Sequence, residues 1–134
     1  MAAHALSIRV YYEDTDAVGI AYHASYLHFA ERGRTELLRD LGFDHGSLAR
    51  EYRILFAVAR CTIEFLRPAR LDDLLVVRTE VSALTGARIE MAQQVERGET
   101  TLARLAVTLA ALEPSTLRPT QLPAPLRAAL ALQK

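Results

Sequence analysis

Residues 74–112, LLVVRTEVSALTGARIEMAQQVERGETTLARLAVTLAAL, alternate apolar and polar side chains over three segments separated by two short turns. Alternation with a period of two is typical of strands that bury one face. The turns contain Gly86 and Gly98, residues suited to hairpin connections. We therefore expect an antiparallel meander of three strands. These strands are Leu74–Leu84, Ala87–Arg97 and Thr100–Leu112.

Two further stretches upstream also predict strands. Ile54–Leu66 is a long apolar stretch that ends at Arg67-Pro68, since proline cannot donate to a sheet ladder. Cys61 alternates there with apolar positions and is expected to be a small buried side chain. Near the N-terminus, Ile8–Tyr12 predicts a first strand that finishes with two tyrosines.

The segment Ala24–Leu41 predicts an amphipathic helix of about five turns, because its apolar and small residues recur at spacings of three and four. Gly42 follows as a residue suited to a helix end. Gly33 lies in mid-helix, where glycine costs about 1 kcal/mol relative to alanine. We therefore expect Gly33 to face a neighbour that approaches closely, and a sheet is the expected neighbour.

The order of elements predicts an α+β architecture. A short second helix is expected near Ser47–Glu51, the proline-rich tail Glu113–Pro125 is expected to wrap or dangle, and a short helix is expected from Pro125. One helix is about 10 Å across, so it covers five strands only if the sheet curls around it. We expect a hotdog fold, a curved antiparallel five-stranded sheet wrapped around one long central helix. Uncovered strand faces favour a homodimer or homotetramer.

Composition narrows the classes of function. The 134 residues fit a single domain, 1–134, and 16 basic residues balance 16 acidic ones, so no nucleic-acid partner is expected. Cys61 is the only cysteine, which excludes an internal disulfide and a multi-cysteine zinc site. No secretory leader or membrane span is recognised, and we expect a soluble cytoplasmic protein. His4 and His45 are expected to be solvated surface residues.

The chemistry is concentrated in Asp14–His23, a loop between the first strand and the long helix. Tyr12–Leu27, YEDTDAVGIAYHASYL, resembles the signature of the 4-hydroxybenzoyl-CoA thioesterase family of hotdog proteins. The resemblance is closest to the Tol-Pal-associated acyl-CoA thioesterases of bacteria. It continues through Phe29–Glu36, Arg67–Asp73 and Leu117–Pro119.

The resemblance implies that Asp16 is the catalytic carboxylate and that the backbone N–H at His23 polarises the thioester carbonyl. The chemistry of the reaction agrees with this assignment. Hydrolysis of a thioester needs a carboxylate that attacks the carbonyl or activates water, and it needs hydrogen-bond donors for the oxyanion that forms. The start of a helix supplies such donors. The His23 side chain is expected to orient water or substrate, Tyr22 and Tyr26 to line the acyl slot, and Gly19 to permit close approach of the ligand.

The implied substrate is an acyl-CoA thioester. Coenzyme A is thus part of the substrate and not a cofactor, and no cofactor and no metal is expected. Arg88 is the first candidate for binding the coenzyme A phosphates. Arg60, Arg67 and Arg70 are the next candidates. The spacing of Asp14–Ser25 does not fit a calcium loop, because Val18 and Ser25 occupy positions that need other ligands. His23 and His28 are five apart and do not share a helix face, as a zinc pair would.

Several alternatives remain open from the sequence. Asp14 is expected to be structural, and Glu31 on the helix is the rival to Asp16 as the catalytic carboxylate. A hotdog hydratase or dehydratase would use a histidine instead. A third possibility is a non-catalytic module that binds acyl-CoA or an acyl carrier protein and serves an inner-membrane-associated complex.

Overall fold

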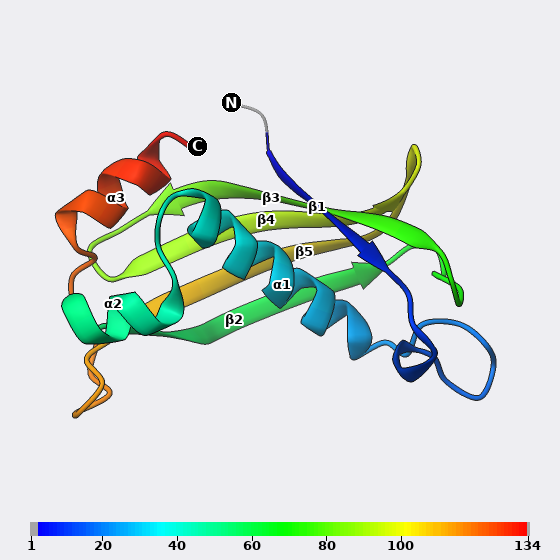
Figure 1. Ribbon diagram of the computed structural model, residues 1–134, viewed down its shortest axis with the longest axis horizontal. Helices are drawn as coiled ribbons and strands as arrows, with labels where there is room; N and C mark the ends of the chain where they lie inside the picture. The colour runs from blue at the N-terminus through cyan, green and yellow to red at the C-terminus, as the bar shows by residue number, and fades with distance from the viewer. Residues whose placement is uncertain (1–2, 134) are drawn as a thin grey trace.

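The computed structural model describes residues 3–133, in which one long helix lies across one face of a five-stranded antiparallel sheet (Figure 1). The strand order is β1-β3-β4-β5-β2. The strands are β1 His4–Arg9, β2 Leu55–Phe65, β3 Leu74–Leu84, β4 Arg88–Arg97 and β5 Thr100–Leu112. The helices are α1 Ser25–Asp40, α2 His45–Glu51 and α3 Ala124–Ala131. The predicted α+β architecture and the meander of β3, β4 and β5 are confirmed.

The first strand lies earlier in the chain than predicted, because it begins at His4 and not at Ile8. It ends at Arg9, and Tyr12–Asp14 forms a turn of 3₁₀ helix instead of continuing the strand. The Tyr11 N–H donates to the Asp14 carboxylate over 2.8 Å, which turns the chain away from the sheet. The side chains of Tyr11 and Tyr12 are consequently exposed.

Helix α1 packs closely on the sheet at Gly33, as predicted. A Cβ atom on Gly33 would lie 2.7 Å from Val77 Cγ1 and 2.9 Å from Thr79 Oγ1. Beside it, the buried Gln93 side chain donates from Nε2 to Ala30 O over 2.9 Å and to Thr79 Oγ1 over 2.8 Å. Because a buried amide is costly when unpaired, these bonds hold α1 at a fixed position over β3 and β4.

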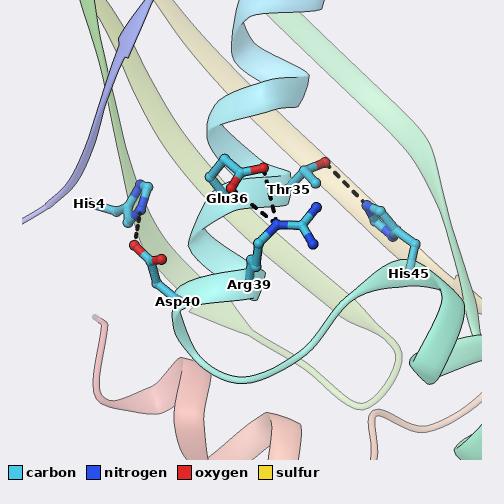
Figure 2. Close-up of polar contacts among 6 residues, drawn as sticks. All are labelled: His4, Thr35, Glu36, Arg39, Asp40 and His45. Atoms are coloured by element: carbon cyan, nitrogen blue, oxygen red, sulfur yellow. Dashed lines mark hydrogen bonds and ion pairs between the residues drawn. The ribbon is translucent and has the colours of Figure 1, made fainter.

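Polar contacts also hold the C-terminal half of α1 (Figure 2). His4 on β1 contacts Asp40 at the end of α1, with Nε2 and Oδ2 2.8 Å apart. Thr35 on α1 contacts His45 at the start of α2, with Oγ1 and Nε2 3.2 Å apart. The expectation that both histidines are solvated surface residues is wrong for His4, whose side chain is only 11% exposed.

Strand β2 forms an edge of the sheet that α1 leaves largely uncovered. The principal contacts of α1 are with β1, β3 and β4, since a single helix spans only about 10 Å. Leu55, Val58 and Phe65 are therefore 39%, 53% and 50% exposed. Cys61 is exposed as well, so the expectation of a buried cysteine is wrong.

The proline-rich tail wraps around the end of the sheet. Its Leu122 N–H donates to Gly86 O over 3.0 Å, and α3 then buries Leu126 and Leu130 completely. Pro125 lies in the first turn of α3, where its missing N–H would have no helical partner. No helix within residues 3–133 is long and apolar enough to cross a membrane.

Candidate active site

Asp14 organises the loop that precedes α1. Its carboxylate accepts the Tyr11 N–H, and its backbone oxygen accepts the Tyr22 N–H over 2.7 Å and the Ser25 hydroxyl over 3.0 Å. The residue is buried, and every one of these contacts is internal to the loop and the helix start. This arrangement supports the structural role expected for Asp14.

Asp16 lies in a tight turn that aims its carboxylate. The Asp16 N–H donates to Ile20 O over 2.9 Å, and the Gly19 N–H donates back to Asp16 O over 3.1 Å. Gly19 has a φ of 88°, a conformation that side chains disfavour. The Val18 N–H donates to Asp16 Oδ1 over 2.9 Å. No group of residues 3–133 donates to Oδ2, so one carboxylate oxygen is held and the other is available.

Asp16 shares a cleft of about 360 Å³ with two other predicted site residues, His23 and Tyr26. The Tyr26 hydroxyl accepts the Ala69 N–H over 3.0 Å, which fixes the buried phenol ring at the wall of this cleft. The ring of Phe65 lies edge-on to Tyr26 and to His23, with centroid distances of 5.4 Å and 6.4 Å. The cleft residues are Asp16, Ile20, Ala21, His23, Tyr26, Phe65, Leu66, Arg67 and Pro68.

The start of α1 presents free backbone donors next to this cleft. The Ser25 N–H donates to Tyr22 O over 2.8 Å and the Leu27 N–H to Ala24 O over 3.1 Å. The N–H groups of His23 and Ala24 donate to no oxygen in the described part of the chain, and no side chain caps the helix. Such N–H groups lie at the positive end of the helix dipole.

Three predicted site residues lie outside the cleft. Tyr22 lines a separate hollow with Glu13, His28 and Arg32, although its ring lies 4.4 Å from that of His23. Gly19 shapes the turn without lining the cleft. Arg88 begins β4, next to the turn between β3 and β4, at the opposite end of the sheet from the loop before α1 (Figure 1).

One wall of the cleft comes from Leu66, Arg67 and Pro68, of which the sequence singled out only Arg67, as a candidate for the coenzyme A phosphates. Arg97 at the end of β4 donates to Pro68 O over 3.1 Å and to Asp73 Oδ2 over 2.7 Å. Burial alone would raise the pKa of Asp73, but hydrogen bonds from the Arg70 N–H and the Arg97 guanidinium outweigh it and lower that pKa. The ionised Asp73 thus helps Arg97 to brace the wall.

The arrangement offers a carboxylate and backbone donors but no cluster of metal ligands. In the part of the chain that the structure describes, no three His, Cys, Asp or Glu side chains are grouped closely enough to hold a metal ion. Glu31, the rival carboxylate, lines a different hollow with Arg34, Thr35 and His45. Asp16 is therefore the only carboxylate among the described residues that line the cleft.

Comparison with known proteins gives a consistent result. Residues 18–104 match the thioesterase superfamily. Acyl-CoA thioesterase YbgC from Haemophilus influenzae is 44% identical over 122 residues, which cover 91% of this chain and 90% of that protein. Acyl-CoA thioester hydrolase YbgC from Escherichia coli O6:H1 is 44% identical over 117 residues, 87% of each chain.

The fold has a counterpart among solved structures. A probable thioesterase from Bartonella henselae is 42% identical and superposes with a TM-score of 0.88, covering 91% of this chain and 100% of that one. The predicted hotdog fold is confirmed, and relatives named as thioester hydrolases confirm the predicted class of enzyme, a thioesterase. The chain belongs to the thioesterase superfamily.

Proposed function

We propose that the protein hydrolyses acyl-CoA thioesters, with Asp16 as nucleophile or general base and the N–H groups near His23 polarising the carbonyl. One observation carries this proposal. Asp16 and His23 line the same cleft, and Asp16 is oriented by the Val18 N–H through Oδ1 while Oδ2 stays unpartnered. A carboxylate held in this way has an oxygen available for a thioester carbon or for a water molecule.

Two routes use the same residues. In the first, Asp16 Oδ2 attacks the carbonyl carbon, the carbon–sulfur bond breaks, the thiol leaves with a proton from water, and water then cleaves the mixed anhydride. In the second, Asp16 takes a proton from a water molecule that attacks the carbonyl directly. Both consume one water molecule and give a carboxylic acid and coenzyme A. The unpartnered N–H groups of His23 and Ala24 would stabilise the oxyanion in either route.

The other predicted residues take supporting roles in the proposal. Tyr26 forms the cleft wall and contacts the acyl group, whereas Tyr22 lies in the neighbouring hollow and acts through the His23 ring that it contacts. Gly19 contributes by allowing the turn that presents Asp16. Arg88 lies at the opposite end of the sheet from the cleft, so it is kept as a ligand for the nucleotide phosphates of coenzyme A bound to a second copy of the chain. No cofactor takes part in these steps.

The names of the relatives support the choice of substrate, because the YbgC proteins of Haemophilus influenzae and Escherichia coli are named for acyl-CoA thioesters. We extend this substrate class to the present chain. By its resemblance to the Tol-Pal-associated branch, the protein would act in the cytoplasm, with an acyl carrier protein or an inner-membrane-associated complex as a partner. The exposed thiol of Cys61 suits a reducing compartment.

A homodimer or homotetramer forms part of the proposal. The unpaired edge and apolar side chains of β2 resemble the surface that a further strand would cover. Phe65 belongs both to β2 and to the cleft, so a second copy on this edge would help to close the active site. Assembly and activity are therefore expected to depend on the same strand.

Release of free thiol from short-chain, long-chain and aromatic acyl-CoA thioesters tests the proposal and identifies the preferred acyl group. The matched variants are Asp16→Asn and Glu13→Gln. The first removes a carboxylate inside the cleft, and the second removes a nearby carboxylate outside it. We expect thiol release from the wild type and from Glu13→Gln only. Release from no thioester would contradict the proposal and favour a binding module, whereas hydration of enoyl-CoA would favour a hydratase.

A further inference from the structure

The rim of the cleft carries a fixed positive charge. Among the residues of 3–133 that line the cleft, Arg67 is the only lysine or arginine. Its side chain is exposed and forms no ion pair with any carboxylate in that range. A guanidinium without an internal counter-ion at the edge of a substrate cleft is suited to an anionic part of the ligand.

The backbone that presents Arg67 is fixed from several sides. The N–H groups of Leu66 and Arg67 both donate to Leu102 O on β5, over 2.8 Å and 3.1 Å. The next residue, Pro68, is held by the Arg97 guanidinium, and Ala69 by the Tyr26 hydroxyl. Arg67 therefore projects from a rigid wall, which lowers the entropic cost of binding.

Within residues 3–133, most N–H donors of the Arg67 guanidinium have no acceptor. One N–H of Arg67 donates to Leu66 O over 2.9 Å, which orients the group. A guanidinium has five N–H donors in a planar fork, and such a fork matches the oxygens of a phosphate. The remaining donors of Arg67 can thus form a bidentate contact with a phosphate ester at the cleft mouth.

We propose that Arg67 binds the phosphate of the 4′-phosphopantetheine arm that carries the acyl group. This inference rests on the proposed function, in which the thioester carbonyl lies at Asp16 and the arm leaves the cleft past its rim. The same phosphate occurs in coenzyme A and in acyl carrier proteins, whereas an acyl-pantetheine lacks it. Arg67 consequently determines how strongly the enzyme prefers phosphorylated carriers over a bare pantetheine thioester.

The test compares acyl-CoA, acyl carrier protein and acyl-pantetheine with the same acyl group. The variants are Arg67→Gln, Arg67→Lys and, as the matched control, Arg104→Gln, which replaces an exposed arginine on the outer face of β5. For Arg67→Gln, we expect kcat/KM on both phosphorylated carriers to fall about 10- to 100-fold through KM. The value for acyl-pantetheine should stay within about twofold, and Arg67→Lys should recover part of the loss.

Three results would overturn the proposal. The first is an equal loss of kcat/KM on acyl-pantetheine, and the second is no loss on any carrier. The third is a loss restricted to acyl-CoA, which would assign Arg67 to the nucleotide. Calorimetric binding of free coenzyme A and of pantetheine to the wild type and to Arg67→Gln gives a readout that needs no turnover. Failure of the wild type to cleave thioesters would contradict the proposed function alone, because weaker coenzyme A binding by Arg67→Gln would still support the phosphate contact.

Discussion

The ring of Phe65 lies edge-on to the ring of Tyr26 with centroids 5.4 Å apart, and this contact joins the end of β2 to the start of α1. Tyr26 is buried, whereas Phe65 remains half exposed. The cleft therefore lies at the boundary between the covered and the uncovered parts of the sheet. Whatever covers β2 will also shape the cleft.

The contribution of the His23 side chain can be separated from that of its backbone. His23→Ala keeps the N–H that is proposed to polarise the carbonyl, so we expect kcat to fall by about tenfold or less, below the range typical of an essential acid or base. Steady-state kinetics would be compared with His28→Ala, which removes an exposed histidine of α1 outside the cleft. A loss as large as that of Asp16→Asn would show that the imidazole itself reacts.

Gly33 should not tolerate a side chain. Gly33→Ala places a methyl group 2.7 Å from Val77 Cγ1, and we expect a loss of about 1–3 kcal/mol in the free energy of unfolding from overpacking. Urea unfolding measures this loss. Gly46→Ala in α2 is the control, because its Cβ would meet the flexible end of Arg50 at 3.0 Å and alanine favours helix. Equal effects at the two positions would contradict the close packing of α1 on β3.

The exposed edge strand should govern assembly. Val58→Lys puts a charge on an exposed apolar position of β2, and we expect it to lower the molecular mass in solution to that of one chain and to reduce thiol release. Analytical ultracentrifugation measures the mass. Leu132→Lys changes a leucine beyond α3 that is more exposed than Val58 and should leave the mass unchanged. A wild-type monomer, or a Val58→Lys oligomer of normal mass, would contradict the assembly through β2.

Glu113 should stabilise the fold in a pH-dependent way. Hydrogen bonds from the N–H groups of Ser115 and Thr116, aided by Arg53, lower the pKa of Glu113 from 4.5 to about 2. Because the folded pKa is the lower one, this stabilisation is complete above pH 4.5 and disappears as the pH falls toward 2. Glu113→Gln should therefore be less stable than the wild type at pH 7, and the difference should vanish near pH 2. A difference independent of pH, measured by urea unfolding, would contradict this linkage.

The regular elements were predictable because local patterns determine them. The alternation in Leu74–Leu84 and Thr100–Leu112 predicted β3 and β5 at their observed bounds. Gly33 predicted close packing, since nothing else favours glycine in mid-helix. The end of β1 was missed because the Asp14 carboxylate captures the Tyr11 N–H, a side-chain effect that strand propensity does not include.

The site was predictable only in part. The family signature predicted that Asp16 and His23 act together, and the structure places both in one cleft. Tyr22 lies in a neighbouring hollow because the turn into α1 rotates successive side chains to different sides. The exposure of Cys61 and the wall around Arg67 depend on how far one helix reaches across five strands, which no local pattern encodes.

The most direct test of the central claim compares binding and turnover in Asp16→Asn. The substitution keeps the size of the side chain and an acceptor for the Val18 N–H, while it removes the carboxylate. We expect Kd for a slowly hydrolysed acyl-CoA analogue to stay within about twofold and kcat for thiol release to fall by about 10²–10⁴. Undiminished turnover by Asp16→Asn would contradict the assignment of Asp16 as the catalytic carboxylate.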